Sequence, residues 1–266
     1  MTLLDLVIVA LGRGAAEVLP VGSAATQLIF RAASRAPAAM LLAVQGAAAL
    51  AVLAYLWRDL SAMGLGLGQV MFKGRRDRPA RQGAELAAQW VLAAAVTVVM
   101  MRLTADTMAA YALTPRIIAV LSAGTALALL LADHMGMTVR RLEHFGYAAA
   151  LLIGLTQAIG AVPGIGTAAL TVVLARFTGF EQRDAFRLSL LMVVPALLTK
   201  AFLALPPSGP LIGSGGESLL AGLLSFIFCL GACRGTEHWL RQGGFAPFAV
   251  LRLVLAVVLF LLARNW

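Results

Sequence analysis

Two interrupted apolar stretches carry the side chains with the clearest chemical potential. In the first stretch, Arg13 and Glu17 lie four residues apart, so they can pair across one helical turn. Ionisable side chains inside membrane segments are rare and are candidates for function. Two interpretations stay open: the charges neutralise each other in the protein interior, or Arg13 is available to bind an anion.

The composition places these side chains in a membrane protein. Hydrophobic residues make up 61% of the 266 residues, charged residues make up 12%, and the mean hydropathy is +0.91. Soluble domains carry about 25% charged residues, so disorder, a coiled coil and nearly every water-soluble fold are excluded. The net charge of +9 is assigned to loop arginines that set membrane orientation, and no nucleic-acid partner is expected.

Six stretches are long enough to span a bilayer, which requires about 17–25 apolar residues. They are Pro37–Trp57, Ala84–Met101, Ile117–Asp133, Leu188–Leu205, Ser218–Cys233 and Phe245–Ala263. Two further stretches, Leu3–Phe30 and Gly146–Leu174, are broken by glycine, proline and polar residues. We expect each to form a re-entrant hairpin, because irregular backbone at membrane depth must be buried or line a wet cavity.

The predicted fold is therefore an all-α polytopic membrane protein forming a single domain over residues 1–266. It has six full transmembrane helices plus two inverted re-entrant helical hairpins. If each hairpin returns to the face it entered from, six basic residues between Arg58 and Arg81 and seven between Arg140 and Arg241 share one face. The positive-inside rule makes that face cytoplasmic and places both termini outside.

A short repeat supports the inverted arrangement. Gly22-Ser23-Ala24-Ala25 recurs as Gly166-Thr167-Ala168-Ala169, and the same offset pairs Arg13 with Gln157. This indicates two inverted repeats, over about residues 1–133 and 134–266, with a binding site near the midplane between them. The alternative is that these small residues only allow close helix packing.

Five short motifs are spread nearly end to end along the chain. They are Glu17-Val18-Leu19-Pro20-Val21, Gln45 before Trp57-Arg58, Gln157 before Pro163-Gly164, Ser189 to Pro195, and Phe245 to Arg252. In these motifs and their order, the chain resembles the undecaprenyl pyrophosphate phosphatase family, the bacitracin-resistance proteins. The resemblance implies the same fold, the bacterial inner membrane, and removal of a phosphate from the C55 polyprenyl diphosphate carrier lipid. With the orientation predicted from the basic residues, both termini are then expected to be periplasmic.

The departures from the family fall on its catalytic motifs. Arg13 replaces the first of two glutamates, whereas Glu17 retains the second. Gly22 replaces the first serine of the first motif, Ser23 retains the second, and Thr26 stands at the histidine position. In the second motif, Thr167 replaces the arginine, and both serines are lost.

These departures weaken the case for hydrolysis. Cleaving a phosphoanhydride requires a nucleophile or activated water, a proton donor and positive charge. In the family the serine or histidine, the glutamate pair and the arginine look suited to these roles, or the glutamate pair instead holds a divalent cation. Glu17 alone offers few of the oxygens that hard cations require. We therefore expect no metal site and no cofactor, with Mg²⁺ or Ca²⁺ needed only if the protein is a phosphatase.

The surviving residues suit phosphate binding better than hydrolysis. Arg13 can replace the positive charge lost at Thr167, and backbone N–H groups at helix starts favour anions. Lys200 lies about twelve residues into its span. Two interpretations stay open: it points into the cavity and meets a phosphate or Glu17, or it snorkels outward or pairs locally. The predicted phosphate-binding set is Arg13, Ser23, Thr26, Gln157, Gly164, Gly166, Thr167, Thr171 and Lys200. Glu17 and Ser23 are the catalytic candidates if the protein is an enzyme, and Arg252 is expected to be structural.

The leading hypothesis is a non-hydrolytic protein that binds a polyprenyl (undecaprenyl) phosphate between the two tips, with or without moving it across the bilayer. The first alternative is a divergent undecaprenyl-diphosphatase that recycles the lipid carrier. The second is a scaffold subunit of an envelope-polysaccharide pathway. The expected partners are a polyprenyl phosphate or diphosphate lipid and the membrane, and a homodimer stays open.

Overall fold

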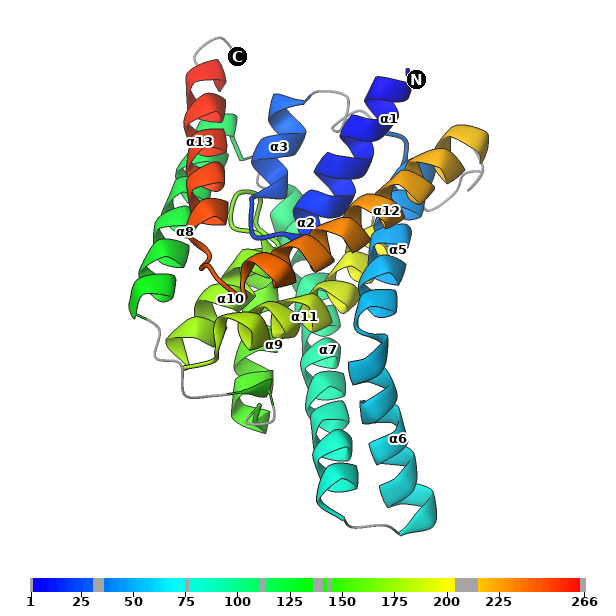
Figure 1. The fold of residues 1–266 in the computed structure, drawn as a ribbon. Coiled ribbons are helices and arrows are strands. Elements are labelled where there is room, and N and C mark those ends of the chain that lie inside the picture. Colours follow the sequence, from blue (N-terminus) through cyan, green and yellow to red (C-terminus); the bar gives the residue numbers. More distant parts are fainter. Residues whose placement is uncertain are drawn as a thin grey trace.

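The computed structural model is a bundle of helices, shown in Figure 1. It describes residues 2–30, 36–74, 77–110, 113–135, 141–142, 145–203 and 215–263. The helices are α1 (Leu3–Val9), the π-helix η1 (Ala10–Ala15), α2 (Ala16–Val18), α3 (Ser23–Ile29), α5 (Ala38–Tyr55), α6 (Trp57–Lys73), α7 (Arg78–Ala110), α8 (Pro115–Met135), α9 (Tyr147–Gly160), α10 (Thr167–Phe177), α11 (Gln182–Leu203), α12 (Gly215–Trp239) and α13 (Ala246–Leu262).

Five helices, α5, α7, α8, α11 and α12, are long and apolar enough to cross a membrane. The chain is therefore a helical, multi-pass membrane protein. These helices coincide with five of the six predicted spans, although Leu205, at the end of one prediction, lies outside the described residues. The sixth prediction falls on α13, an apolar helix of 17 residues. Its length of about 26 Å, at 1.5 Å per residue, is slightly less than the thickness of a typical hydrocarbon core.

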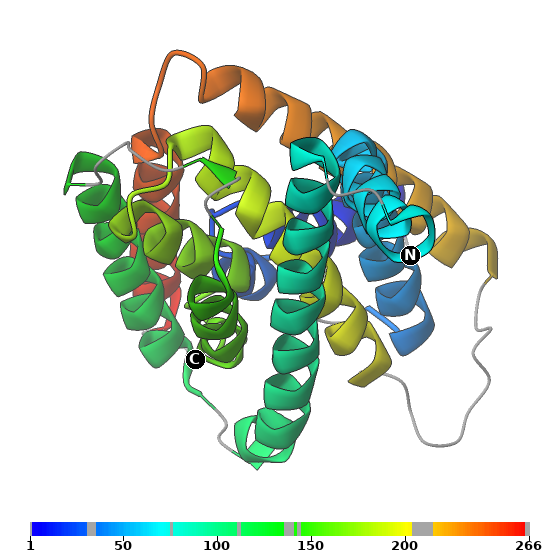
Figure 2. The same ribbon diagram turned by 90° about the horizontal axis from the view of Figure 1, so that it is seen from below.

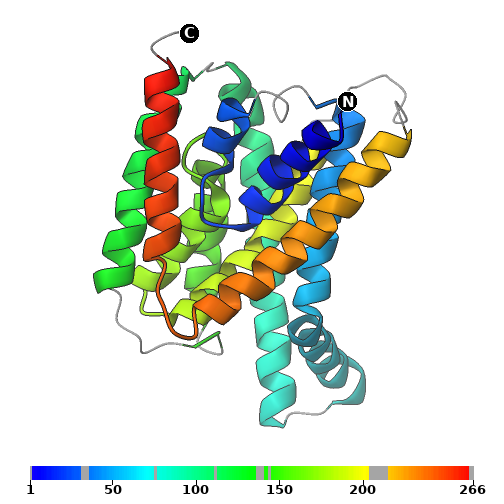
Figure 3. The ribbon, with the colours of Figure 1, turned by 45° about the horizontal axis from the view of Figure 1, so that its top comes forward.

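Both interrupted stretches form helix–turn–helix hairpins. In the first, α1, η1 and α2 run to Val18, and α3 returns beside them after a short turn (Figure 3). In the second, α9 ends at Gly160 and α10 returns against it. The returning helices begin just after Gly22 and Gly166, whose φ angles are +90° and +82°. Glycine adopts this left-handed conformation readily because it has no Cβ, so both turns depend on it.

Helix α11 is the centre of the bundle. It packs against α5, α7 and α10, and 72% of its most apolar stretch is buried. Pro195 lies inside this helix and has no N–H, so the carbonyl of Leu191 loses its helical partner. The indole Nε1 of Trp90 in α7 donates a hydrogen bond to that carbonyl at 3.0 Å. Because unpaired carbonyls are costly in an apolar interior, this bond fixes α7 against α11.

Small residues bring the outer helices close together. Figures 1 and 2 show α8 paired with α13 on one side of the bundle and α5 paired with α12 on the other. Ser225 of α12 donates from Oγ to the carbonyl of Val44 in α5 at 2.9 Å. A Cβ on Gly14 would lie 2.2 Å from the same Oγ, so only glycine lets η1 pack this closely against α12.

The long hairpin formed by α6 and α7 is not among the elements predicted from the sequence. Glycines and polar residues interrupt the apolar positions of α6, so its sequence contains no continuous apolar stretch. Helix α7 begins at Arg78 and has 33 residues, well beyond the predicted span. Figures 1 and 3 show that this hairpin projects from the end of the molecule opposite the two chain termini.

The close contact within this hairpin can be tested at its glycines. A Cβ on Gly83 would lie 2.7 Å from the carbonyl oxygen of Ala62. We expect Gly83→Ala to lower the free energy of unfolding by about 1–3 kcal/mol, because the backbones must separate. Gly64→Ala is the matched control, since its Cβ would meet nothing within 4 Å. Thermal unfolding in detergent measures both, and equal melting temperatures would contradict the contact.

Candidate functional site

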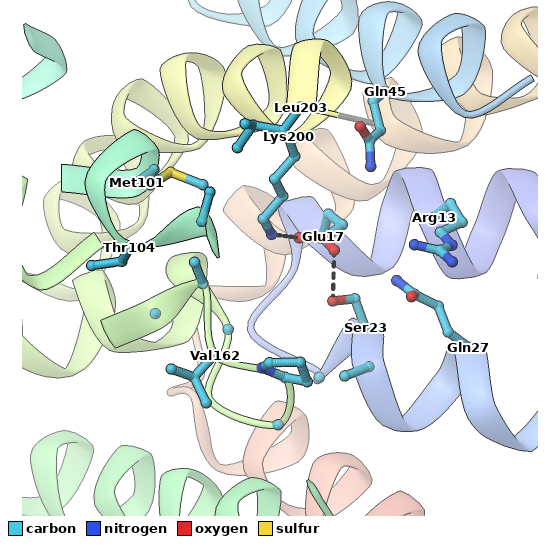
Figure 4. Close-up of a pocket in the computed structure, with 18 of the residues that line it drawn as sticks. Arg13, Glu17, Ser23, Gln27, Gln45, Met101, Thr104, Val162, Lys200 and Leu203 are labelled. Carbon is cyan, nitrogen blue, oxygen red and sulfur yellow. Dashed lines mark hydrogen bonds and ion pairs between the residues drawn. The ribbon is translucent and has the colours of Figure 1, made fainter. Parts of the chain in front are cut away.

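A cavity of about 500 Å³ lies between the tips of the two hairpins. Its wall is formed by the first hairpin, the turn between α9 and α10, and parts of α5, α7, α11 and α13. Figure 4 shows side chains from several of these elements pointing into the same space. The polar and charged side chains that line it are Arg13, Glu17, Ser23, Gln27, Gln45, Thr104, Asp106, Lys200 and Arg252.

Glu17 is at the centre of the cavity's charge arrangement. Its carboxylate is only 8% exposed, and both of its oxygens have partners. Lys200 Nζ lies 2.7 Å from Oε2, and Ser23 Oγ donates to Oε1 at 2.9 Å. A buried carboxylate is tolerated only with such partners. Since Lys200 belongs to α11, this ion pair also ties the first hairpin to the central helix.

Arg13 lines the cavity on a different part of the wall. It lies in η1, a π-helical segment, whose i→i+5 hydrogen bonds change the angular relation that residues four apart have in an α-helix. Figure 4 shows its guanidinium near Gln27, and Lys200 forms an ion pair with Glu17. The charge of Arg13 still acts on the Glu17 carboxylate, so Arg13 adds positive potential to the cavity.

Arg252 of α13 holds the second tip in place. Its side chain is almost entirely buried, with 1% of the residue exposed. Nη2 donates to the carbonyls of Gly164 and Ile165 in the turn between α9 and α10. Nε donates to the carbonyl of Ser122 in α8 at 3.2 Å. The guanidinium therefore pairs turn carbonyls that have no helical partner, which agrees with the structural role expected for it.

The Arg252 side chain also lies beside the first tip. A Cβ on Gly22 would lie 3.4 Å from Arg252 Cγ, and one on Gly166 would lie 3.5 Å from Arg252 Nη1. The two positive-φ glycines thus flank one arginine side chain. This arrangement brings the two tips together although they are far apart in the sequence.

The structure does not bring every predicted phosphate-binding residue to the cavity. Gly164 and Gly166 line it, as do Arg13, Ser23 and Lys200. Gln157 donates instead to Thr171 Oγ1 at 2.7 Å, and Thr171 donates to the carbonyl of Thr167 at 2.9 Å. These three residues are buried behind the second tip, outside the cavity lining. Thr26 donates to the carbonyl of Gly22 at 3.2 Å and is also absent from the lining.

Sequence reasoning missed several residues that line the cavity. Gln27 donates to the carbonyl of Gly12 at 3.4 Å, and Thr104 and Asp106 come from the far part of α7. Gln45 is 4% exposed, and its Oε1 has no hydrogen-bond partner among the described residues. A glutamine in the middle of an apolar span was the available signal for Gln45. Asp106 carried no such signal, because the predicted span ends before it.

The fold and this cavity define a class: a multi-pass helical membrane protein with a charged cavity between two helical hairpins. Residues 6–258 match the family described as bacitracin resistance protein BacA. The chain belongs to this family.

Curated relatives cover nearly the whole chain. Undecaprenyl-diphosphatase 1 of Rhodospirillum rubrum is 32% identical over 278 residues, covering 99% of this chain and 96% of the relative. Undecaprenyl-diphosphatase 1 of Paramagnetospirillum magneticum is 31% identical over 266 residues, covering 95% and 94%. Undecaprenyl-diphosphatase of Jannaschia sp. is 28% identical over 274 residues, covering 99% of both chains.

The role of Arg252 can be tested by removing its donors. Arg252→Ala leaves the carbonyls of Gly164 and Ile165 unpaired, so we expect the free energy of unfolding to fall by about 3 kcal/mol. Amide hydrogen exchange should accelerate across residues 162–166. Arg234→Ala, which removes an exposed arginine, serves as the control. Unchanged exchange in this turn would show that another contact holds the tip.

The ion pair between Glu17 and Lys200 can be tested with a double-mutant cycle. Glu17→Gln or Lys200→Met leaves one buried charge without its partner, which is expected to cost about 3 kcal/mol in each variant. The double variant should lose clearly less than the sum of the two, because it removes both charges. Unfolding in detergent measures all four proteins. Additive losses would mean that the 2.7 Å contact carries no coupling.

Proposed function

We propose that this protein is a divergent lipid diphosphatase that removes the terminal phosphate of a polyprenyl diphosphate, of the undecaprenyl class, in lipid-carrier recycling. The observation that carries the proposal is the hydrogen bond from Ser23 Oγ to Glu17 Oε1 at 2.9 Å, inside the cavity between the tips. A hydroxyl nucleophile within reach of a carboxylate base, which a third group orients, is a typical catalytic arrangement. Lys200 is that third group. The names of the relatives support the same activity.

The charge of the cavity suits a diphosphate. Arg13, Lys200 and Arg252 line it as cations, against the carboxylates of Glu17 and Asp106. A cavity with excess positive charge attracts anions and stabilises negative charge that develops on a transferring phosphoryl group. Arg252 is already occupied by backbone carbonyls, so Arg13 and Lys200 are the cations assigned to the phosphate oxygens.

In this mechanism Ser23 Oγ attacks the terminal phosphorus while Glu17 Oε1 accepts the hydroxyl proton. The bond from that phosphorus to the bridging oxygen breaks, and the lipid monophosphate leaves with its electron pair. Water then cleaves the phosphoserine, which releases inorganic phosphate and restores the Ser23 hydroxyl. Glu17 serves as the base in the first step and passes that proton to the leaving lipid phosphate. In the second step it accepts a proton from the attacking water and returns it to Ser23 Oγ.

A second function, binding of a polyprenyl phosphate without hydrolysis, is favoured by one specific observation. Arg13 stands where the family has a second glutamate, so the cavity lacks one member of that carboxylate pair. Losing one member of a catalytic unit usually removes most of the rate. The same cavity would then hold the lipid phosphate and leave its ester bond intact.

For either function we propose six full spans, including α13, and two re-entrant hairpins in the bacterial inner membrane. The α6–α7 hairpin lies at the opposite end from the termini, and Arg78 and Arg81 begin its second helix. By the positive-inside rule, this arrangement supports a cytoplasmic hairpin and periplasmic termini. The lipid phosphate would reach the cavity near the membrane midplane.

The decisive test is phosphate release from undecaprenyl diphosphate by the purified protein in detergent. We expect Ser23→Ala and Glu17→Gln each to reduce the rate by about 100-fold or more. Ser61→Ala is the matched control, since that hydroxyl is on α6 and bonds only to the carbonyl of Arg58. Absence of release, together with saturable binding of the monophosphate lipid, would select the second function. Absence of both would reject the two proposals.

A further inference from the structure

The cavity residues do not fit the divalent cation that the family resemblance implies. Mg²⁺ and Ca²⁺ take six or more oxygen ligands, mostly carboxylates, carbonyls and water. Of the two carboxylates that line the cavity, Glu17 has both oxygens occupied, and Asp106 is exposed on α7. Among the described residues, no cluster of three histidine, cysteine, aspartate or glutamate side chains could hold a metal ion.

The charge pattern also opposes a divalent cation. Arg13 occupies the position of the family's first glutamate and lines the same cavity, so it would repel a second cation near Glu17. A pair of glutamates with one divalent cation has no net charge. Glu17 with Arg13 and Lys200 has a net charge of +1 from side chains alone. The cavity therefore reaches a potential suited to phosphate without a bound metal.

We infer that Lys200 replaces the divalent cation, so that phosphate recognition in this protein is independent of metal ions. Its ammonium takes the metal's place on Glu17 and presents its remaining N–H donors to the phosphate. An ammonium has three donors, and Glu17 Oε2 uses one of them at 2.7 Å. The inference rests on the proposed function in one respect, that the ligand is a phosphate.

The exposure of Lys200 distinguishes this role from simple neutralisation of Glu17. A lysine that only neutralised a buried carboxylate would need no access to the cavity, but the Lys200 side chain is 22% exposed and lines it. Its neighbour across the cavity is Gln45, and Figure 4 shows both side chains reaching into the same space. The Gln45 amide is buried and its Oε1 lacks a partner in the described part of the chain. Such a group indicates that a ligand or water completes the site.

The first experiment measures metal binding directly. Ca²⁺ and Mn²⁺ are titrated calorimetrically into the wild-type protein and Glu17→Gln in detergent, without lipid. We expect no saturable binding that depends on Glu17, because Lys200 and Ser23 occupy its oxygens. Stoichiometric binding to the wild type that Glu17→Gln abolishes would overturn the inference.

The second experiment measures saturable binding of undecaprenyl monophosphate in EDTA and in excess Mg²⁺ or Ca²⁺. Wild-type affinity should be equal in all three conditions, and dependence on the metal would overturn the inference. Lys200→Met should weaken binding by about tenfold or more, because a charge-assisted hydrogen bond is lost. Lys200→Arg should retain most of the affinity, and Arg81→Met, which removes an exposed charge on α7, should retain all of it.

Two further comparisons distinguish a failure of the inference about Lys200 from a misfolded variant and from a failure of the proposed function. Because Lys200→Met leaves Glu17 unpaired, the double variant Lys200→Met/Glu17→Gln serves as the folding control. It should unfold close to the wild type yet still bind weakly, and wild-type affinity in that variant would overturn the role of Lys200. If the wild type binds no phosphate lipid at all, the proposed function fails, and the metal titration still decides whether Lys200 has replaced a cation.

Discussion

The burial of Arg252 is the constraint on which the arrangement of the two hairpins depends. A guanidinium inside an apolar bundle must find acceptors for its donors, and here the acceptors are carbonyls of the second turn and of α8. Those carbonyls in turn need a donor, since the turn has no helical partners for them. The guanidinium and these backbone carbonyls thus satisfy each other's hydrogen bonds. Gly22 of the first tip lies beside the same side chain. Arg252 itself lines the cavity between the two tips.

A second buried charge sets the chemistry of that cavity. Two side chains bind the carboxylate of Glu17: Lys200 of α11 forms an ion pair with it, and Ser23 of α3 donates a hydrogen bond to it. The two interactions place a hydroxyl, a carboxylate and an ammonium in sequence at the tip of one hairpin. The tip therefore keeps a hydroxyl and a carboxylate in contact, although other residues of the family's motifs are replaced. The charges around this tip differ from those of the family's motifs, because Arg13 of η1 and Lys200 of α11 supply the positive groups.

The sequence was sufficient to predict five of the long membrane helices and both hairpins, because these follow from hydropathy and from glycine placement. It was not sufficient where local geometry decides. Arg13 and Glu17 have α-helical spacing, but η1 is a π-helix and directs Arg13 toward Gln27. Gln157 and Thr171 match family positions, yet they bond to each other behind the tip. By contrast, Lys200 pairs with Glu17, 183 positions away in the chain, which is one of the two contacts predicted for it inside the cavity.

Helix α7 is continuous from the projecting hairpin to the rim of the cavity, and this has a mechanical consequence. At 1.5 Å per residue its 33 residues form a rod of about 50 Å. The hydrogen bond from Trp90 to the carbonyl of Leu191 joins this rod to α11 somewhat before the middle of α7. Packing against α9 and α11 also holds this rod in the bundle, so it can tilt only as one body, and a tilt of the projecting arm displaces Thr104 and Asp106 at its other end. Through this rod, a load on the hairpin would be transmitted to the rim of the cavity.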